Sequence, residues 1–188
     1  MPNVAAHSPG SPGTAELVQR AQAGDRAAFA VLYREFARTV HGIALATCGE
    51  DDADDLVQDV FVQAFQRLTE VRDPRAFAGW LCTTARRAAI DRLRARQQRP
   101  QPMPLDEPVG REHAPGDAFA VRAAAARALA CIRRLPEAYR ETLTLRLVEG
   151  LSGPEIAART GLTHGSVRVN LVRGMAQLRP LLAEAGLP

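Results

Sequence analysis

One face of a predicted helix between Arg75 and Gln97 carries an aromatic ring together with charged and polar side chains. At three- and four-residue spacing these are Trp80, Thr83, Arg87, Asp91 and Arg94. An aromatic ring or a guanidinium plane stacks on unpaired bases, and positive charges follow the phosphate backbone. The face therefore predicts contact with single-stranded nucleic acid. Core packing of Trp80 and a merely solvated arginine face are the alternatives that these residues leave open.

A second candidate lies near the C-terminus, where the signals of a helix-turn-helix follow one another in order. Ser152 is a good N-cap for a short helix, Gly161 can adopt the left-handed conformation of a tight turn, and Thr163 can cap the next helix. We expect this next helix, from Thr163 to Leu178, to be a recognition helix that reads duplex DNA in the major groove. An ordinary helical hairpin is the alternative.

The recognition helix has two different faces. The inward face is formed by Val167, Leu171, Gly174 and Leu178, which recur at helical spacing. The other face carries Ser166, Val169, Asn170 and Arg173. Side chains of this second set can reach base edges or phosphates.

Charge is unevenly distributed along the chain. The net charge of the 188 residues is only +3, so no global basic field points to nucleic acid. An acidic block comprises Glu50, Asp51, Asp52, Asp54, Asp55 and Asp59, and a basic block comprises Arg86, Arg87, Arg92, Arg94, Arg96 and Arg99. Opposite patches predict two different partners. For the acidic block, a solvated helix start that complements the helix dipole is the alternative.

The remaining chemistry-bearing residues exclude several classes of protein. Cys48, Cys82 and Cys131 are scattered and odd in number, so we expect buried thiols in a reducing compartment rather than disulfides or a zinc site. The sequence has no phosphate loop, no metal cluster and no nucleophile beside a histidine. We therefore expect no catalytic residue, no metal and no cofactor. Without a signal peptide or a long apolar run, the protein is expected to be cytoplasmic, with no membrane contact.

Composition and periodicity divide the chain into four parts. Residues 1–13 predict a flexible tail, and residues 14–98 a helical domain. Residues 99–117 contain five prolines and predict an extended linker. Residues 118–188 return to a helical pattern. The predicted fold is all-α, with two small helical domains joined by a proline-rich linker.

Within the first domain, caps and apolar spacing predict the individual helices. A short helix from Thr14 to Gly24 is followed by a second helix that Asp25 caps. The second helix carries one apolar face, formed by Phe29, Leu32, Phe36, Val40 and Ile43. A third helix runs from about Asp52 to Leu68, and a loop from Thr69 to Arg75 leads into the helix that carries Trp80.

Three stretches of the sequence resemble one known family. DDLVQDVFVQAFQRL (residues 54–68) and FAGWLCTTARRAAIDRLRAR (residues 77–96) resemble region two of bacterial sigma factors of the extracytoplasmic-function type. LPEAYRETLTLRLVEGLSGPEIAARTGLTHGSVRVNLVRGMAQLR (residues 135–179) resembles region four of the same family. The order is that of the family, and the likeness covers nearly the whole chain.

The resemblance implies a dissociable subunit of RNA polymerase that directs the enzyme to promoters and helps to open them. Region two binds the polymerase clamp, and the matching residues here are Asp55, Gln58 and Asp59. Region two also binds the −10 element as single-stranded DNA, which assigns that role to the face with Trp80, Thr83, Arg87, Asp91 and Arg94. The loop from Thr69 to Arg75 occupies the position of the family's −10 specificity loop.

Region four of the family binds the duplex −35 element and the polymerase flap. The residues expected at the −35 element are Thr163, His164, Ser166, Arg168, Val169, Asn170 and Arg173. Backbone amides at the Thr163 cap can also hold a phosphate. Many members of the family are held inactive by an anti-sigma factor, which is therefore a further expected partner.

The chain departs from the family pattern at positions that face DNA. It has Gly153-Pro154, Val169 and Asn170 where the family usually has other, mostly polar, residues, and Arg87 where asparagine is common. These changes leave the fold intact but leave the promoter sequence open. A stand-alone helix-turn-helix transcription regulator is the alternative function. It explains the C-terminal motif but not the acidic block or the face with Trp80.

Overall fold

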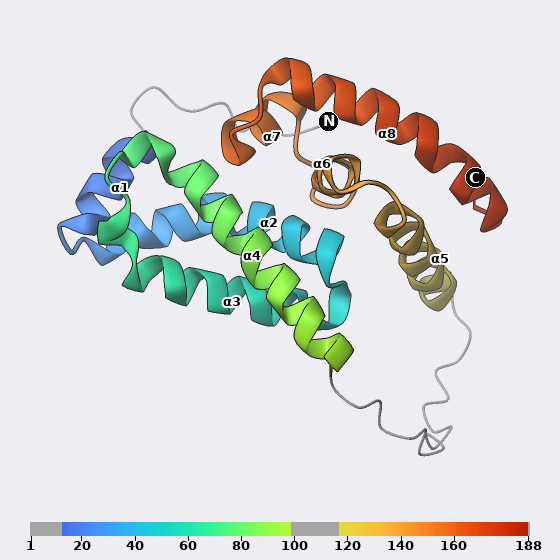
Figure 1. Cartoon of the computed structure of the whole chain (residues 1–188), viewed down its shortest axis with the longest axis horizontal. Coiled ribbons are helices and arrows are strands. Elements are labelled where there is room, and N and C mark those ends of the chain that lie inside the picture. Colours follow the sequence, from blue (N-terminus) through green and yellow to red (C-terminus); the bar gives the residue numbers. More distant parts are fainter. Residues whose placement is uncertain (1–12, 99–116, 188) are drawn as a thin grey trace.

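The computed structural model describes residues 13–98 and 117–187, and every regular element in these two ranges is helical (Figure 1). The first half contains α1 (Thr14–Gln22), α2 (Arg26–Thr47), α3 (Glu50–Gln66), the 3₁₀ turns η1 (Leu68–Glu70) and η2 (Pro74–Ala76), and α4 (Phe77–Gln98). The second half contains α5 (Asp117–Arg133), α6 (Glu137–Leu147), α7 (Gly153–Thr160) and α8 (His164–Glu184). The all-α prediction is confirmed. The predicted tail and linker fall almost wholly outside the described residues.

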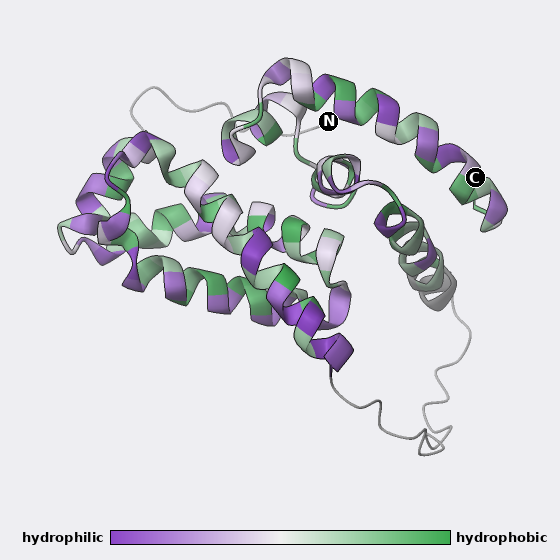
Figure 2. Ribbon diagram, viewed as in Figure 1, coloured by the Kyte–Doolittle hydropathy of each residue, from purple (hydrophilic) through white to green (hydrophobic). Residues whose placement is uncertain are grey.

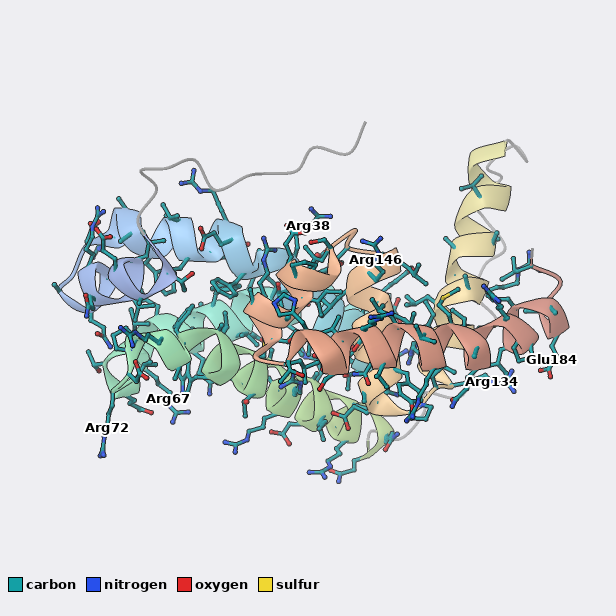
Figure 3. All side chains as sticks on the ribbon, turned by 90° about the horizontal axis from the view of Figure 1, so that it is seen from above. Arg38, Arg67, Arg72, Arg134, Arg146 and Glu184 are labelled. Carbon is teal, nitrogen blue, oxygen red and sulfur yellow. The ribbon has the colours of Figure 1, made fainter. Side chains whose placement is uncertain are left out.

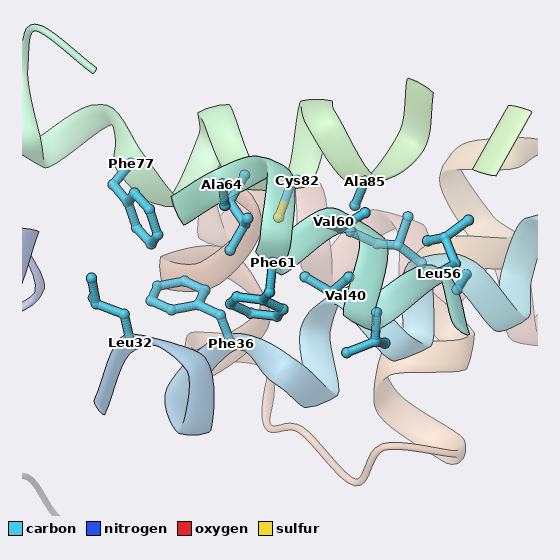
Figure 4. Close-up of a cluster of buried hydrophobic side chains, with 14 of the residues drawn as sticks. Leu32, Phe36, Val40, Leu56, Val60, Phe61, Ala64, Phe77, Cys82 and Ala85 are labelled. Atoms are coloured by element: carbon cyan, nitrogen blue, oxygen red, sulfur yellow. The ribbon is translucent and has the colours of Figure 1, made fainter. Parts of the chain in front are cut away.

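α2 is the central helix of the first half, and α1, α3 and α4 pack around it. Asp25 caps it as expected, because its carboxylate accepts a hydrogen bond from the amide of Ala28 at 3.0 Å. Phe36 on its buried face meets Phe77 of α4 edge to face, with ring centroids 5.5 Å apart (Figure 4). Phe29, predicted on the same face, is only partly buried.

The second half has two small hydrophobic clusters. One joins α5, α6 and α8 through Cys131, Ile132, Leu135, Leu143 and Leu178. The other lies among α6, α7 and α8 and comprises Leu145, Leu151, Ile156, Ala157 and Val167. Hydrophobic and hydrophilic residues alternate along α8 in Figure 2, as expected of a helix with one buried face.

The recognition helix is longer than the sequence predicted. α8 continues past Leu178 and through Pro180 to Glu184. Pro180 lacks an amide proton and so loses one helical hydrogen bond. Leu181 and Leu182, however, pack against the cluster that includes Cys131, and this burial offsets the loss. Near the C-terminal end of α8, the guanidinium of Arg134 lies 3.7 Å from the carboxylate of Glu184 (Figure 3).

The two halves contact each other through α2 and α4 on one side and α6 and α7 on the other. Gly42 of α2 faces α6 so closely that a Cβ atom would lie 2.6 Å from Cδ2 of Leu145. Arg86 of α4 donates two hydrogen bonds to the carboxylate of Glu141, at 2.7 and 2.8 Å. The thiol of Cys82 donates to the carbonyl of Arg159 at 3.1 Å, and burial raises its pKa to about 12.

A charged cluster completes this contact at the turn between α6 and α7. The buried carboxylate of Glu149 lies 2.7 Å from Nδ1 of His41 and 3.6 Å from Nε of Arg38. Arg38 also donates to the backbone carbonyl of Glu149. From α3, the carboxylate of Asp54 lies 3.6 Å from Nε2 of His41. The hydrogen bond to Glu149 raises the pKa of His41, more than its partial burial lowers it.

This cluster predicts that contact between the halves depends on pH. A raised pKa means that the contact favours protonated His41, so the stabilisation is complete below the ordinary histidine pKa of about 6.5 and is lost as the pH rises through the raised value. The radius of gyration from small-angle X-ray scattering should therefore increase as the pH rises above about 6.5. The variant His41→Gln should remove this dependence, and an unchanged pH profile in that variant would contradict the assignment to His41.

Candidate nucleic-acid interface

α4 presents three faces with different neighbours. Leu81, Ala85 and Ala89 are buried in the core of the first half. Cys82 and Arg86 contact the second half. The third face is exposed to solvent and carries Thr83, Arg87, Asp91 and Arg94. The structure thus brings four of the five residues predicted to bind the −10 element onto one exposed surface.

The polar side chains of this exposed face differ in how far other groups of the protein already bind them. The hydroxyl of Thr83 donates to the carbonyl of Gly79 at 2.8 Å, within the helix. Arg94 lies 3.8 Å from Asp91, so its charge is partly compensated. Arg87 makes no ion pair with any residue that the structure describes. Its guanidinium is therefore the positive charge of this face most available to a phosphate.

Trp80 lies at the border between the exposed face and the core. It is half-buried, packs against the core of the first half, and has its ring centroid 6.1 Å from that of Phe77. One part of the indole therefore stabilises the core while another remains accessible. Of the two roles that the sequence left open for Trp80, the packing against the core is observed, and the contact with DNA stays a prediction.

The loop between α3 and α4 is anchored rather than loose. The side-chain amide of Gln22 in α1 donates to the carbonyls of Leu68 and Val71, at 3.0 and 2.9 Å. The carboxylate of Asp73 accepts from the amide of Arg75 at 2.9 Å and starts the turn η2. Such a preorganised loop can hold a base without first paying the entropy of ordering.

The acidic and basic blocks of the sequence contact each other in part. Arg92 of α4 lies 3.0 Å from Asp59, and Arg96 lies 3.3 Å from Asp51 and 3.5 Å from Asp52. Residues of the two blocks therefore also pair with one another within the chain. These ion pairs join α3 to the C-terminal part of α4.

The residues predicted to bind the clamp lie together on the outer face of α3. Asp55 and Gln58 are exposed, and Asp59 remains largely exposed despite its contact with Arg92. The same face continues with Val62 and Phe65, two large apolar side chains that are also exposed. Sequence reasoning missed these two residues.

The exposed apolar residues of α3 have aromatic neighbours from α2. Phe65 meets Phe29 edge to face, with centroids 5.0 Å apart, and Tyr33 lies 4.6 Å from Phe61. A shallow groove runs between these rings and Gln58. The signal was present in the spacing, because Val62 and Phe65 follow Gln58 at helical intervals on the side away from the predicted inner face. The face therefore combines carboxylates with apolar surface.

The helix-turn-helix forms through the contacts that the sequence predicted. The hydroxyl of Ser152 accepts from the amide of Glu155 at 3.4 Å, and the carboxylate of Glu155 accepts from the amide of Ser152 at 2.8 Å. The hydroxyl of Ser152, which also donates to this carboxylate at 2.6 Å, and the amide of Ser152 together lower the pKa of Glu155. Gly161 has φ +77°, the left-handed conformation, and Thr163 accepts from the amide of Ser166 at 3.1 Å.

Most of the residues predicted to bind the −35 element are exposed on α8. They are Thr163, His164, Ser166, Arg168, Val169 and Arg173. Asn170 differs, because it is half-buried and its amide donates to the carbonyl of Ala138 at 3.4 Å and to the hydroxyl of Thr142 at 3.3 Å. Its geometry is that of a residue that positions α8 against α6.

Residues 13–98 and 117–187 contain neither a membrane-spanning helix nor a cluster of metal-ligating side chains. No helix there is long and apolar enough to cross a bilayer. No group of three or more histidine, cysteine or acidic side chains there could hold a metal ion. Cys48, Cys82 and Cys131 are all buried free thiols, as the sequence predicted.

Two family models match the chain, one in each half. Residues 32–99 match Sigma-70 region 2, and residues 125–178 match Sigma-70, region 4. The first match spans α2 to α4, and the second spans the helix-turn-helix and most of α8. The candidate surfaces on α3, α4 and α8 therefore all lie inside matched regions.

Individual proteins match over most of the chain. The ECF RNA polymerase sigma factor BldN of Streptomyces coelicolor is 33% identical over 88% of this chain and 65% of its own length. The RNA polymerase sigma-H factor of Pseudomonas aeruginosa is 31% identical over 90% of this chain and 96% of its own. A solved structure of CnrH in complex with the cytosolic domain of CnrY matches with a TM-score of 0.60 and 28% identity, over 91% of this chain and 97% of that one.

The capping box gives a prediction about stability. Ser152→Ala removes the side-chain acceptor at the start of α7 and should lower the free energy of unfolding by about 1 kcal/mol. Urea denaturation followed by circular dichroism measures this difference. Ser152→Thr keeps the hydroxyl and should retain most of the stability. If the alanine variant were as stable as the unsubstituted protein, the box would not support the motif.

Proposed function

Because the chain belongs to the extracytoplasmic-function sigma factors of bacterial RNA polymerase, we propose that it binds the core enzyme, recognises promoter −10 and −35 elements and promotes initiation. The observation that carries the proposal is that α3, α4 and α8 each keep one candidate face exposed while the opposite face is buried. The chain binds and positions, and the polymerase makes the phosphodiester bonds. Its place of action is the cytoplasm, with the polymerase.

The outer face of α3 is the surface proposed for the polymerase clamp. Asp55 and Asp59 supply negative charge that steers a basic partner into contact. Val62 and Phe65 supply apolar area next to that charge, and a buried aromatic anchor contributes more to affinity than a charge at the rim. Gln58 lies between the two kinds of surface and can hydrogen-bond to the partner.

The exposed face of α4 is the surface proposed for the opened −10 element. Arg87 is available to phosphates, and the accessible part of Trp80 can stack on a base. Opening the duplex costs base stacking, and a protein that holds an extruded base recovers part of this cost. The anchored loop from Thr69 to Arg75 is the proposed site for such a base, because Gln22 already fixes its backbone.

The exposed face of α8 is the surface proposed for the duplex −35 element. A helix of this kind fits the major groove with the residues near its N-terminus at the base edges. Arg168 and Arg173 can hold phosphates, and the amides at the Thr163 cap add a second anion contact. The likeness to CnrH, solved with the cytosolic domain of CnrY, supports an anti-sigma factor as a further partner.

Run-off transcription tests the proposed function. Core RNA polymerase is incubated with genomic DNA fragments, with and without this protein, and specific transcripts are expected only in its presence. If the protein neither binds core polymerase nor initiates at any promoter, the proposal fails. Binding to duplex DNA without any binding to core polymerase would instead favour a stand-alone regulator.

The clamp surface gives a second prediction in the same system. Asp55→Arg should weaken binding to core polymerase by at least about tenfold, because it places a positive charge against a basic partner. Fluorescence anisotropy with labelled protein measures the affinity. Asp55 is the better choice than Asp59, whose replacement would also break the contact with Arg92.

A matched control for this charge reversal is Glu16→Arg. Glu16 is likewise an exposed acidic residue, in the first turn of α1, and lies outside the proposed surface. It should leave core binding unchanged. Equal core affinity of the Asp55→Arg variant and the unsubstituted protein would remove the clamp assignment.

A further inference from the structure

Two residues on the outer side of the recognition helix are apolar and exposed. Val169 is 44% exposed and Val172 is 65% exposed, and both lie in the part of α8 that the proposed function assigns to the −35 element. With about 100° between successive residues, both point away from Val167, Leu171 and Gly174, which face the core. A reading face that serves only to form hydrogen bonds would carry polar residues at these two positions.

Arginines border the two valines on both sides. By the same helical spacing, Arg168 lies to one side of the line through Val169 and Val172, and Arg173 lies to the other. Neither arginine makes an ion pair within the part of the chain that the structure describes. A strip of apolar surface between two unpaired cations matches the major groove, whose floor lies between two phosphate backbones.

The amide side chain among the residues predicted at the −35 element, that of Asn170, is engaged within the protein. An asparagine can recognise adenine through two hydrogen bonds. Here the amide of Asn170 donates to Ala138 and Thr142 of α6 instead. The outer centre of the helix, where Val169 and Val172 lie, offers apolar contacts, and the only apolar group on a base edge in the major groove is the 5-methyl group of thymine.

We propose that Val169 and Val172 determine −35 specificity by packing against thymine 5-methyl groups in the major groove. The inference rests on the proposed function and names the base that the site selects. Arg168 and Arg173 position the helix by holding phosphates and carry no sequence information themselves. This division explains how valine at position 169, where the family usually has another residue, can still form part of a DNA-reading surface.

Removing single methyl groups from the DNA tests the proposal. The −35 element is first selected from random duplexes with the holoenzyme that contains the full-length protein, and each thymine is then replaced by deoxyuridine. Loss of a contacted methyl should weaken binding about fourfold, and the remaining thymines should be insensitive. A selected element without thymine on either strand, or one insensitive at every thymine, overturns the proposal.

Protein variants assign the effect to the two valines. Each of the variants Val169→Ser and Val172→Ser should lose the discrimination between thymine and deoxyuridine at one position of the −35 element. Both variants should retain their affinity for core polymerase. The control Val121→Ser changes a valine that is 67% exposed on α5 and should keep the full discrimination. The proposal is overturned if the serine variants still distinguish thymine from deoxyuridine at every position. It is also overturned if these variants lose only their affinity for core polymerase, because the valines would then contact the polymerase and not DNA.

The same measurements separate this proposal from the proposed function. If the holoenzyme initiates at its selected promoter but is indifferent to every thymine methyl, the specificity assignment fails and the proposed function stands. If no core binding and no initiation are observed, the proposed function itself fails.

Discussion

The second half of α2 is buried on nearly all sides, and the remainder of the molecule is arranged around this helix. Every residue from Thr39 to Ala46 is buried except His41, which is half-buried. One side packs against α3 and α4 in the core of the first half, and the other packs against α6 of the second half. Glycine and alanine at 42, 44 and 46 allow this close approach, because helices approach only as far as their side chains permit. A polar outer side on α2 would leave α6 without a packing surface.

Because of this arrangement, the three faces of α4 have different neighbours. Its core side is fixed by α2, its second side is occupied by α6 and α7, and only the third side remains for a ligand. Arg86 and Arg87 are neighbours in sequence, yet Arg86 is bound to Glu141 and Arg87 faces solvent. Contact between the halves therefore leaves all three candidate surfaces uncovered, so binding of a partner to any one of them does not first require that the halves separate.

The sequence predicted local features well and tertiary ones less well. The caps at Asp25, Ser152 and Thr163 and the left-handed Gly161 are decided by neighbouring residues, so the prediction was correct for each. The sequence could not show that Arg92 and Arg96 pair with the acidic block, because these partners lie more than thirty residues apart. Likewise, Asn170 belongs to the expected reading face by periodicity, and only the position of α6 shows that its amide is already bonded. The extension of α8 through Pro180 to Glu184 likewise depends on tertiary packing, because Leu181 and Leu182 lie against the cluster that includes Cys131.

The two hydrogen bonds between Arg86 and Glu141 have a consequence for the counterions around the protein. As long as these hydrogen bonds are formed, the charge of Arg86 is neutralised by Glu141, and Arg86 is not available to bind a phosphate. If the halves part on the polymerase, Arg86 becomes a free cation beside Arg87, and each further phosphate neutralised steepens the dependence of single-strand binding on log salt concentration by about 0.7. The opposite half then gains an uncompensated carboxylate, Glu141. Rising ionic strength would thus weaken the single-strand contact of the separated form more steeply than that of the form in which Arg86 is still paired.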